Sequence, residues 1–334
     1  MCLCLVGVKY YICLILFGDF MVDVRFGLRV PAFPVDGSGF DVFVRQIYDF
    51  LGRFEGEFDS AWICDHLYPW ADFVDRTVPN LECFTSIAYL SAIYRKYKWG
   101  SIVLCNNFRS PVLVAKMGAI LQNLCGGRFI LGIGAGWKRD EYIAYGFEFP
   151  SARVRVEMLE EAVQIIRLMW RDGRASFHGK YYRVDDAICM PKPNPIPPLM
   201  IGGGGEKYTL RVVAKFADWW NIPNVSPKIY RHKLNVLEGH CRRVGRDFDE
   251  IVKTLANMVA IARSKSDAIR IARGSPFVRR GFEENYIIGN PEMVVEKLKE
   301  YVRLGVSVFI LRFLDFPSMS GAELFVNEVI PKFA

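Results

Sequence analysis

The feature that most constrains the fold is the alternation of short apolar segments with amphipathic segments along nearly the whole chain. The apolar segments have the length of buried strands, and Gly or Pro residues mark many of the joins. Strands that alternate with helices in this way form a parallel sheet. The predicted strands are 25–30, 60–65, 101–105, 129–133, 199–201, 218–222, 255–262 and 307–313. The predicted helices are 39–54, 83–97, 111–125, 150–171, 206–216, 227–245, 291–304 and 319–331.

Eight strands, each followed by a helix, are the number found in an α/β fold of the (β/α)8 TIM-barrel type. An open doubly wound sheet is the alternative, but the first strand–helix turn lacks its dinucleotide-binding glycine pattern. Residues 175–198 interrupt the alternation with a hairpin-like FHGKYYRV and a proline-rich PKPNPIPP. We therefore predict a TIM barrel with an insertion after the fourth helix, and we expect this insertion to fold over the barrel mouth.

The first twenty residues are unusually apolar for the start of a chain. They lack the basic start and the small-residue cleavage site of a signal peptide. They are also short for a membrane span, and Lys9 interrupts them. We interpret residues 1–20 as an apolar N-terminal extension that packs on the outside, or as the product of a start codon upstream of the native one. Residues 21–334 are expected to form one barrel domain, and we predict no membrane partner.

Charge and cysteine content narrow the functional classes. The formal net charge is +7, but Lys and Arg are scattered, whereas a nucleic-acid surface requires a clustered basic stripe. The nine cysteines include no CxxC pair, which favours a reducing cytoplasm. The four histidines form no HxxxH or HExxH motif, so we predict no metal site. The expected partner is a small molecule, with no nucleic acid.

Four consecutive glycines, Gly202, Gly203, Gly204 and Gly205, separate a predicted strand from a predicted helix. Each glycine lowers the stability of the fold by about 0.5–1 kcal/mol relative to alanine. A run of four therefore indicates that the bare backbone has a specific role. Bare backbone at a helix start can direct several amides at one anion, which the helix dipole also favours. We interpret the run as a phosphate cradle, with the Thr209 hydroxyl as a further donor. A flexible connection or a tight packing contact is the alternative.

The second predicted strand ends in Asp65-His66, followed closely by Trp70. Active sites of TIM barrels lie at the carboxyl ends of the strands. A histidine there can accept or donate a proton near neutral pH, and Asp65 could orient it. Trp70 offers a flat apolar wall. The alternative is a turn-forming aspartate beside a histidine that only packs.

Two further strand ends carry candidate ligand contacts. Asn106, Asn107 and Arg109 follow the third strand, where asparagines bind the edge of a heterocycle or simply form a turn. On the fourth strand, Gly132, Gly134 and Gly136 alternate and leave one face bare. A flat ring could lie on that strip, or a helix could pack against it.

Arg312, near the end of the eighth predicted strand, has two readings that the sequence leaves open. It either belongs to the layer of side chains inside the barrel or faces a ligand anion.

Taken in order, these segments strongly resemble the bacterial luciferase-like superfamily of flavin and deazaflavin oxidoreductases. The likeness extends over nearly everything from Met21 onward. It is carried by DHLYPW at 65–70, the GGRFILGIGAGWKRDEY region within 108–146, RVRVEMLEEAVQIIRLMW at 153–170, FHGKYYRVDDA at 177–187, the tetraglycine region within 191–221, and GNPEMVVEKLKEYVRLGV at 289–306.

The resemblance implies a (β/α)8 barrel that is commonly a homodimer and binds coenzyme F420 or FMN. It places the cofactor ring over strand ends near Cys105 and Gly134, and the cofactor phosphate at the tetraglycine. The implied cofactor-binding residues are Cys105, Asn106, Gly134, Ala135, Gly136, Gly202, Gly203, Gly204, Gly205 and Thr209.

The Asp-His followed by Pro-Trp resembles the deazaflavin-dependent branch, which includes sugar-phosphate dehydrogenases. That likeness implies that His66 polarises or deprotonates a substrate hydroxyl while hydride passes to the deazaflavin, with Asp65 and Trp70 beside it. That branch carries a catalytic glutamate directly after its glycine-rich strand. Trp137 stands there in this chain, which argues against a glucose-6-phosphate activity.

The leading hypothesis is therefore a cytoplasmic F420-dependent enzyme that moves hydride to or from a small organic substrate. An alcohol and a methylene-tetrahydromethanopterin are the candidate types. An FMN-dependent luciferase-like monooxygenase is the second hypothesis. A barrel that only binds flavin or another ligand is the third, and the presence of His66 argues against it.

Overall fold

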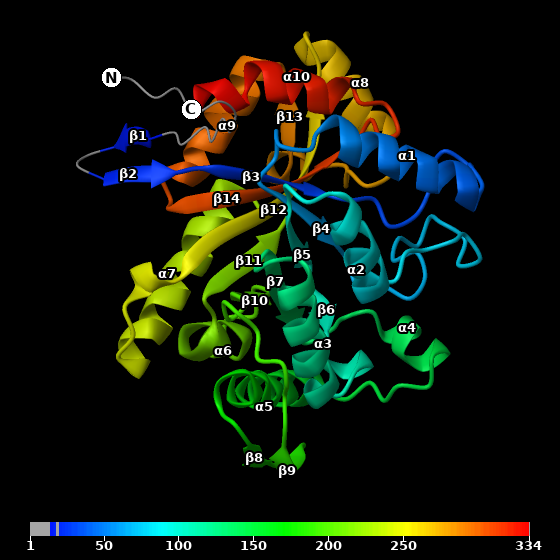
Figure 1. Cartoon of the computed structure of the whole chain (residues 1–334). Coiled ribbons are helices and arrows are strands. Elements are labelled where there is room, and N and C mark those ends of the chain that lie inside the picture. Colours follow the sequence, from blue (N-terminus) through cyan, green and yellow to red (C-terminus); the bar gives the residue numbers. More distant parts are fainter. Residues whose placement is uncertain (1–13, 18–19, 334) are drawn as a thin grey trace, which may run out of the picture.

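The computed structural model describes residues 14–17 and 20–333. Within these residues, eight parallel strands close into a barrel around which the helices are arranged (Figure 1). The ring closes because β7 pairs with β10 and β14 pairs with β3. The prediction of a (β/α)8 TIM barrel is confirmed. In ring order the strands are β3 (Arg25–Arg29), β4 (Ser60–Ile63), β5 (Lys98–Ser101), β7 (Phe129–Gly134), β10 (Leu199–Gly202), β11 (Trp219–Pro223), β12 (Val252–Ile261) and β14 (Val306–Phe313).

The outer helices present apolar faces to the strands. In α1, Phe43, Ile47, Phe50 and Leu51 recur at helical spacing and are buried. Three helices start with proline in the first turn, where its missing N–H costs nothing. The outer helices are α1 (Phe40–Arg53), α2 (Cys83–Ile93), α3 (Pro111–Leu124), α5 (Ala152–Arg171), α6 (Thr209–Phe216), α7 (Pro227–Val244), α9 (Pro291–Val302) and α10 (Ser320–Glu328).

Several elements were absent from the sequence-based expectation. The predicted third strand 101–105 is in fact β5, which ends at Ser101, followed by the short β6. Helix α6 begins at Thr209 rather than at 206, because the tetraglycine is followed by turns. The additional elements are α4 (Arg139–Ala144), α8 (Lys265–Gly274), β6 (Leu104–Cys105), β13 (Ile287–Gly289), and the 3-10 turns η1 (Asn106–Phe108), η2 (Phe248–Glu250), η3 (Glu283–Asn285) and η4 (Ile330–Lys332).

The insertion after α5 forms an antiparallel hairpin of β8 (Ala175–His178) and β9 (Arg183–Ala187). Its turn donates three backbone N–H groups to the Glu161 carboxylate on α5. The proline-rich part accepts hydrogen bonds from Gln122 and Asn123 at the end of α3. The insertion therefore lies against the outside of α5 and α3 (Figure 1). The expectation that it covers the barrel mouth is wrong, because none of residues 175–198 lines the cavity there.

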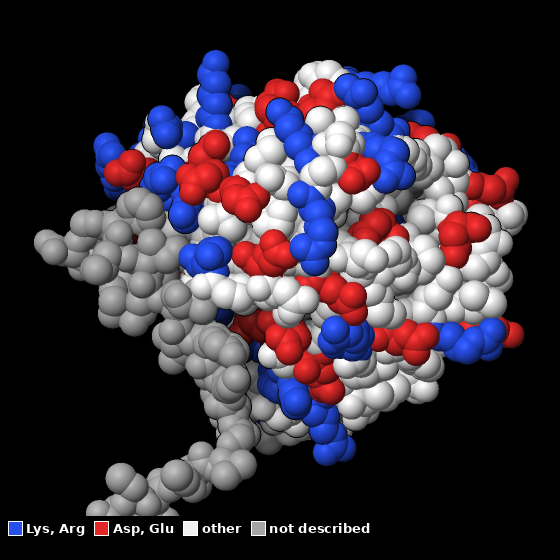
Figure 2. Space-filling view, turned by 90° about the horizontal axis from the view of Figure 1, so that it is seen from above, with Lys and Arg blue, Asp and Glu red and all other residues white. Residues whose placement is uncertain are grey.

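Near the N-terminus, β1 (Leu14–Phe17) pairs antiparallel with β2 (Phe20–Asp23). The proposed boundary between residues 20 and 21 therefore falls inside β2. Residues 1–13 and 18–19 of the predicted extension lie outside the described residues. Among the helices of the described ranges, none is long and apolar enough to cross a bilayer. Figure 2 shows basic and acidic side chains interspersed over the face seen from above.

The barrel interior is filled by side chains and is not a channel. Trp62, Met200 and Trp219 form a separate apolar cluster with Ile130, Ala256, Val308 and Ile310. Gly27 and Gly100 make room for the Trp62 ring on the neighbouring strands. A Cβ at Gly100 would lie 2.2 Å from Trp62 ring carbons, and one at Gly27 would lie 2.7 Å from the indole nitrogen. A ligand can therefore enter only at an end of the barrel.

We expect Gly100→Ala to lower the free energy of unfolding by about 1–3 kcal/mol, because the added methyl overpacks the Trp62 site. Urea denaturation monitored by circular dichroism measures this change. Gly239→Ala in α7 is the matched control, since a Cβ there meets no heavy atom within 4 Å. The control should be stabilised by up to about 1 kcal/mol through helix propensity. An unchanged midpoint for Gly100→Ala would contradict the packing described for the interior.

Candidate active site

A cavity of about 440 Å³ opens at the carboxyl ends of the barrel strands. All of the predicted site residues line it except Asn106: Asp65, His66, Trp70, Cys105, Gly134, Ala135, Gly136, Gly202, Gly203, Gly204, Gly205 and Thr209. These residues come from β4, β6, β7, β10 and α6 or from the segments that follow them. The fold thus brings together segments that are far apart in the sequence, at the end of the barrel where such sites occur.

Asn106 lies outside this cavity and is almost fully buried in η1. Its amide nitrogen donates to the Tyr182 hydroxyl at 3.1 Å, which ties η1 to the hairpin of the insertion. Arg109, in the same segment, forms ion pairs with the carboxylates of Asp65 and Glu82 and does not line the cavity. The structure therefore does not bring Asn106 to the predicted ring position.

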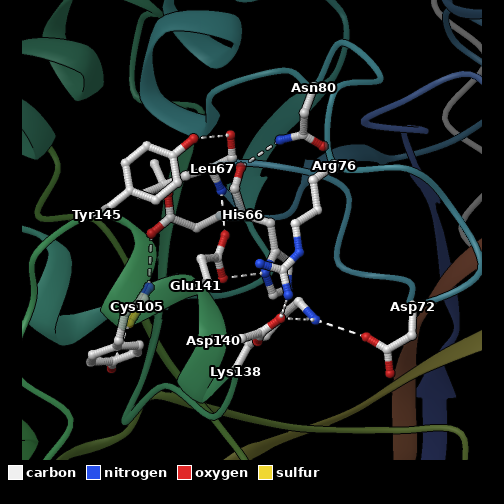
Figure 3. Close-up of polar contacts among 12 residues, drawn as sticks. His66, Leu67, Asp72, Arg76, Asn80, Cys105, Lys138, Asp140, Glu141 and Tyr145 are labelled. Atoms are coloured by element: carbon white, nitrogen blue, oxygen red, sulfur yellow. Dashed lines mark hydrogen bonds and ion pairs between the residues drawn. The ribbon is translucent and has the colours of Figure 1, made fainter.

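His66 is held by Glu141, a residue that the sequence analysis did not select. The His66 Nδ1 atom lies 2.9 Å from the Glu141 carboxylate, and the same carboxylate accepts the Leu67 backbone N–H (Figure 3). Glu141 is 1% exposed and comes from α4. The Asn80 side chain and the Tyr145 hydroxyl donate to the carbonyls of His66 and Leu67. The histidine is therefore fixed from both its ring and its backbone.

The expectation that Asp65 orients His66 is wrong. Successive residues of an extended chain point to opposite sides, so the two side chains diverge. Asp65 accepts two hydrogen bonds of 2.8 Å from the Arg109 guanidinium and one from the Cys105 backbone N–H. Burial opposes the charge of Arg109, but Asp65 and Glu82 outweigh it and raise the pKa of Arg109. This ion pair joins the ends of β4 and β6 and is a structural feature beneath the cavity.

The Glu141 contact determines which nitrogen of His66 can act on a ligand. A carboxylate can only accept at Nδ1, so that nitrogen carries the proton in the neutral ring. Nε2 is then the basic atom, and within the described ranges it has no protein hydrogen bond. The rings of Trp70 and Trp137 lie 6.4 and 5.8 Å from the imidazole, centroid to centroid. His66 thus presents a general base between two aromatic walls.

The tetraglycine turn, called the cradle below, packs too tightly for side chains, since a Cβ at Gly204 would lie 2.5 Å from Ile222. Gly203 has φ +125°, a backbone conformation that residues with a side chain rarely adopt. Its N–H donates to the Asn221 carbonyl, and its carbonyl accepts from the Trp220 indole N–H. A Cβ at Gly205 would lie 2.8 Å from the Thr209 hydroxyl oxygen. In the described part of the chain, the amides of Gly204 and Gly205 find no acceptor. Unpaired amides on bare backbone suit a phosphate group.

A bare strip leads from this cradle across the cavity. Cβ atoms at Gly134 and Gly202 would lie 2.9 and 2.8 Å from the same methyl group of Val103. Gly134 and Gly136 line the cavity, whereas Gly132 packs against the Ser101 carbonyl inside the barrel. The glycine alternation therefore serves two purposes. Gly134, with Val103, borders an apolar surface of the kind on which a flat ring can lie, whereas a Cβ at Gly136 would lie 2.7 Å from the Cys105 sulfur.

Comparisons with known proteins identify the family of the chain. The sequence model of the family described as luciferase-like monooxygenase matches residues 55–281. The chain belongs to the luciferase-like monooxygenase family. The resemblance seen in the sequence is thereby confirmed, and the protein is an oxidoreductase of this family.

Two curated relatives of this luciferase-like protein are named F420-dependent glucose-6-phosphate dehydrogenase. The one from Nocardia farcinica is 34% identical over 82% of this chain and 89% of its own. The one from Kineococcus radiotolerans is 34% identical over 49% of this chain, which spans about half (48%) of that relative. A solved F420-dependent secondary alcohol dehydrogenase, in complex with an F420-acetone adduct, has the same fold. Its TM-score is 0.78 at 21% identity, covering 93% of this chain and 99% of the other.

In this luciferase-like protein, Cys105 lines the cavity as an uncharged thiol. Its sulfur lies 2.8 Å from the Tyr142 hydroxyl oxygen, and burial raises the pKa of the thiol to about 12. Thiols react as thiolates, so Cys105 cannot serve as a nucleophile near neutral pH. Across the described residues, no group of three or more His, Cys, Asp and Glu is arranged to hold a metal ion.

We expect Cys105 in the native protein to react with iodoacetamide roughly 10³-fold more slowly at pH 8 than an ordinary thiol, because its raised pKa suppresses the thiolate. The rate should increase steadily with pH up to about 12, where the thiol ionises. Peptide mass spectrometry measures the rate at this position, with the urea-unfolded chain as the reference. Equal rates in the native and unfolded states would contradict the buried thiol.

Proposed function

We propose that this protein is a coenzyme F420-dependent oxidoreductase that transfers hydride between the cofactor and a small alcohol or ketone. The observation that carries the proposal is the placement of the His66–Glu141 pair and the tetraglycine cradle in one cavity. A general base for a hydroxyl proton and an anchor for a phosphate-bearing coenzyme are the two components that such a reaction requires.

The choice of F420 is supported by the names of the three similar proteins reported above, each of which is called F420-dependent. In this chain, the free amides of Gly204 and Gly205 would hold the cofactor phosphate, with Thr209 beside them. The strip formed by Val103 and Gly134 would support the ring. When bound, the deazaflavin supplies the carbon that accepts or donates hydride.

His66 handles the proton of the reaction. Oxidation of an alcohol to a ketone removes a hydride from carbon and a proton from oxygen, and His66 Nε2 accepts that proton. The Glu141 carboxylate stabilises the imidazolium that forms, because it accepts a hydrogen bond from Nδ1–H, with 2.9 Å between the nitrogen and the oxygen. Trp70 and Trp137 restrict water around the ring. In the opposite direction, the imidazolium returns the proton to the ketone oxygen.

This arrangement favours an alcohol over a methylene-tetrahydromethanopterin, which has no hydroxyl proton for His66 to remove. The site also differs, at one position, from the site expected of a glucose-6-phosphate dehydrogenase. The position directly after the glycine-rich strand is Trp137, 62% exposed at the cavity wall, and not a glutamate. A cytoplasmic location and a homodimeric assembly remain part of the proposal, as the sequence analysis predicted them.

Titration of the purified protein with F420 and, separately, with FMN tests the cofactor. Saturable quenching of F420 fluorescence with no response to FMN is the expected result. Preferential binding of FMN would overturn the F420 assignment and favour the monooxygenase hypothesis. Binding of either cofactor without turnover of any alcohol in a broad panel would favour the ligand-binding barrel.

His66→Ala should lower turnover roughly 10²–10⁴-fold, because the general base is lost while the cofactor cradle is intact. The initial rate of F420 reduction by an active alcohol, at saturating substrate, measures turnover. The dissociation constant for F420 should stay near the wild-type value. Turnover at the wild-type rate would remove His66 from the mechanism.

Glu141→Gln extends the same test to the positioning residue. The double variant with His66→Ala should lose no more activity than His66→Ala alone, because the two side chains act as one unit. Asp140→Asn is the matched control, since this neighbouring carboxylate pairs with Arg76 and Lys138 and does not touch His66. Additive losses in the double variant would show that Glu141 acts independently of His66.

Gly203→Val should weaken F420 binding by at least 10-fold, because a branched side chain at φ +125° distorts the cradle and its Cβ lies 3.2 Å from Thr209. Fluorescence titration measures the dissociation constant. Gly281→Val is the matched control, since Gly281 also has a positive φ but meets no atom within 4 Å. An unaltered dissociation constant for Gly203→Val would place the phosphate elsewhere.

A further inference from the structure

Two arginines lie side by side inside the mouth of the barrel. Leu28 on β3 is paired with Leu311 on β14, so the next residues, Arg29 and Arg312, are neighbours across the two strands. Val308 and Ile310 of β14 belong to the cluster inside the barrel, and Arg312 follows with the same alternation. Arg29 lines the cavity that holds His66, whereas Arg312 lies beside it and is not among the residues that line the cavity.

Neither guanidinium has a carboxylate partner within the described ranges. Arg312 is 4% exposed and is covered by aromatic rings, with the Phe277 centroid 4.0 Å and the Phe33 centroid 5.7 Å from its guanidinium carbon. Burial and the adjacent Arg29 charge lower the pKa of Arg312 to about 9. By contrast, the buried Arg109 is neutralised by two carboxylates. Two adjacent like charges without a carboxylate partner among the described residues are an arrangement that an anion would balance.

The position of the pair relates it to the reacting end of the site. The Trp70 ring lies 5.7 Å from the Arg29 guanidinium carbon and 6.4 Å from the His66 ring. The tetraglycine follows β10, which stands four strands from β3 in either direction around the ring. The arginines and the phosphate cradle therefore lie on opposite sides of the mouth. An anion at the arginines is consequently a different group from the cofactor phosphate.

We propose that Arg29, with the charge of Arg312 beside it, forms the binding site for an anionic group of the substrate. The substrate is then a hydroxy acid or a phosphorylated alcohol whose oxoanion binds the guanidinium groups and whose hydroxyl faces His66. Guanidinium groups bind carboxylate and phosphate through paired hydrogen bonds. The reacting carbon lies between the two anion sites. This inference rests on the proposed function and assigns the substrate class of the same cavity.

Anion binding can be measured without turnover. The tryptophan fluorescence of the full chain, to which Trp70 contributes, is titrated with lactate and with inorganic phosphate, each with and without bound F420. Arg29→Met and Arg312→Met should each raise the dissociation constant of the preferred anion roughly 10–100-fold. A preference for lactate indicates a carboxylate substrate, and a preference for phosphate indicates a phosphorylated one.

Matched control variants distinguish the loss of a positive charge at the site from a general loss of folded structure. Arg25→Met removes an arginine from the other end of β3, where it pairs with Asp23, and should leave anion binding unchanged. Arg29→Lys keeps the charge and should retain most of the binding lost in Arg29→Met. Circular dichroism verifies folding. If a variant does not fold, the decrease of wild-type affinity with ionic strength and the Arg29→Lys result still test the proposal.

Three outcomes would overturn the inference: no anion binding by the wild-type protein, equal binding by the methionine variants, or loss of F420 binding in those variants with anion binding retained. The proposed function fails separately, through absence of F420 binding by the wild-type chain. In that case the lactate titration without cofactor still tests the arginine pair, whereas the phosphate titration does not, because inorganic phosphate would also fit the empty tetraglycine cradle. A faster oxidation of lactate than of propane-1,2-diol would add support from catalysis.

Discussion

The site depends on the pairing of β7 with β10, which closes the barrel. This pairing sets Ile133 beside Ile201, so that Gly134 and Gly202 become neighbours at the edge of the sheet. Two glycine-rich segments that are remote in the sequence then border one surface, with the Val103 methyl between them. The bare strip and the anion cradle are therefore a single feature. Without closure, neither segment would differ from an ordinary flexible connection.

Around this feature, the chain distributes charge unequally beneath the mouth. Asp65 and Arg109 neutralise each other and connect the segments that follow β4 and β6. Arg29 and Arg312 are left unbalanced on the far side from the glycines. The free amides of the cradle add a second electropositive region. His66 lies between these two regions, and a mouth of this kind suits a coenzyme and a substrate that both carry negative charge.

The His66–Glu141 contact illustrates how far sequence reasoning reached. The histidine could be selected because it ends a predicted strand, where barrel enzymes place their chemistry. Its partner could not, because α4 is a six-residue helix in a loop and its register is set by packing. Asp65 was the nearest carboxylate in the chain, yet the alternation of an extended backbone turned it away from the histidine. Adjacency in sequence was a poor guide to contact.

The sequence by itself determined the barrel, the order of its elements and the segments that border its mouth, because strand and helix periodicities and glycine runs are local properties. It also showed that the chain resembles the luciferase-like family, which the comparisons confirm. Only the tertiary structure decided that Glu141 holds His66, that Asn106 lies outside the cavity and that the insertion packs on α5 and α3. It also decided that Arg312 stands beside Arg29, with no carboxylate partner among the residues that the structure describes. These facts depend on strand register and helix packing, which join residues that no local pattern connects.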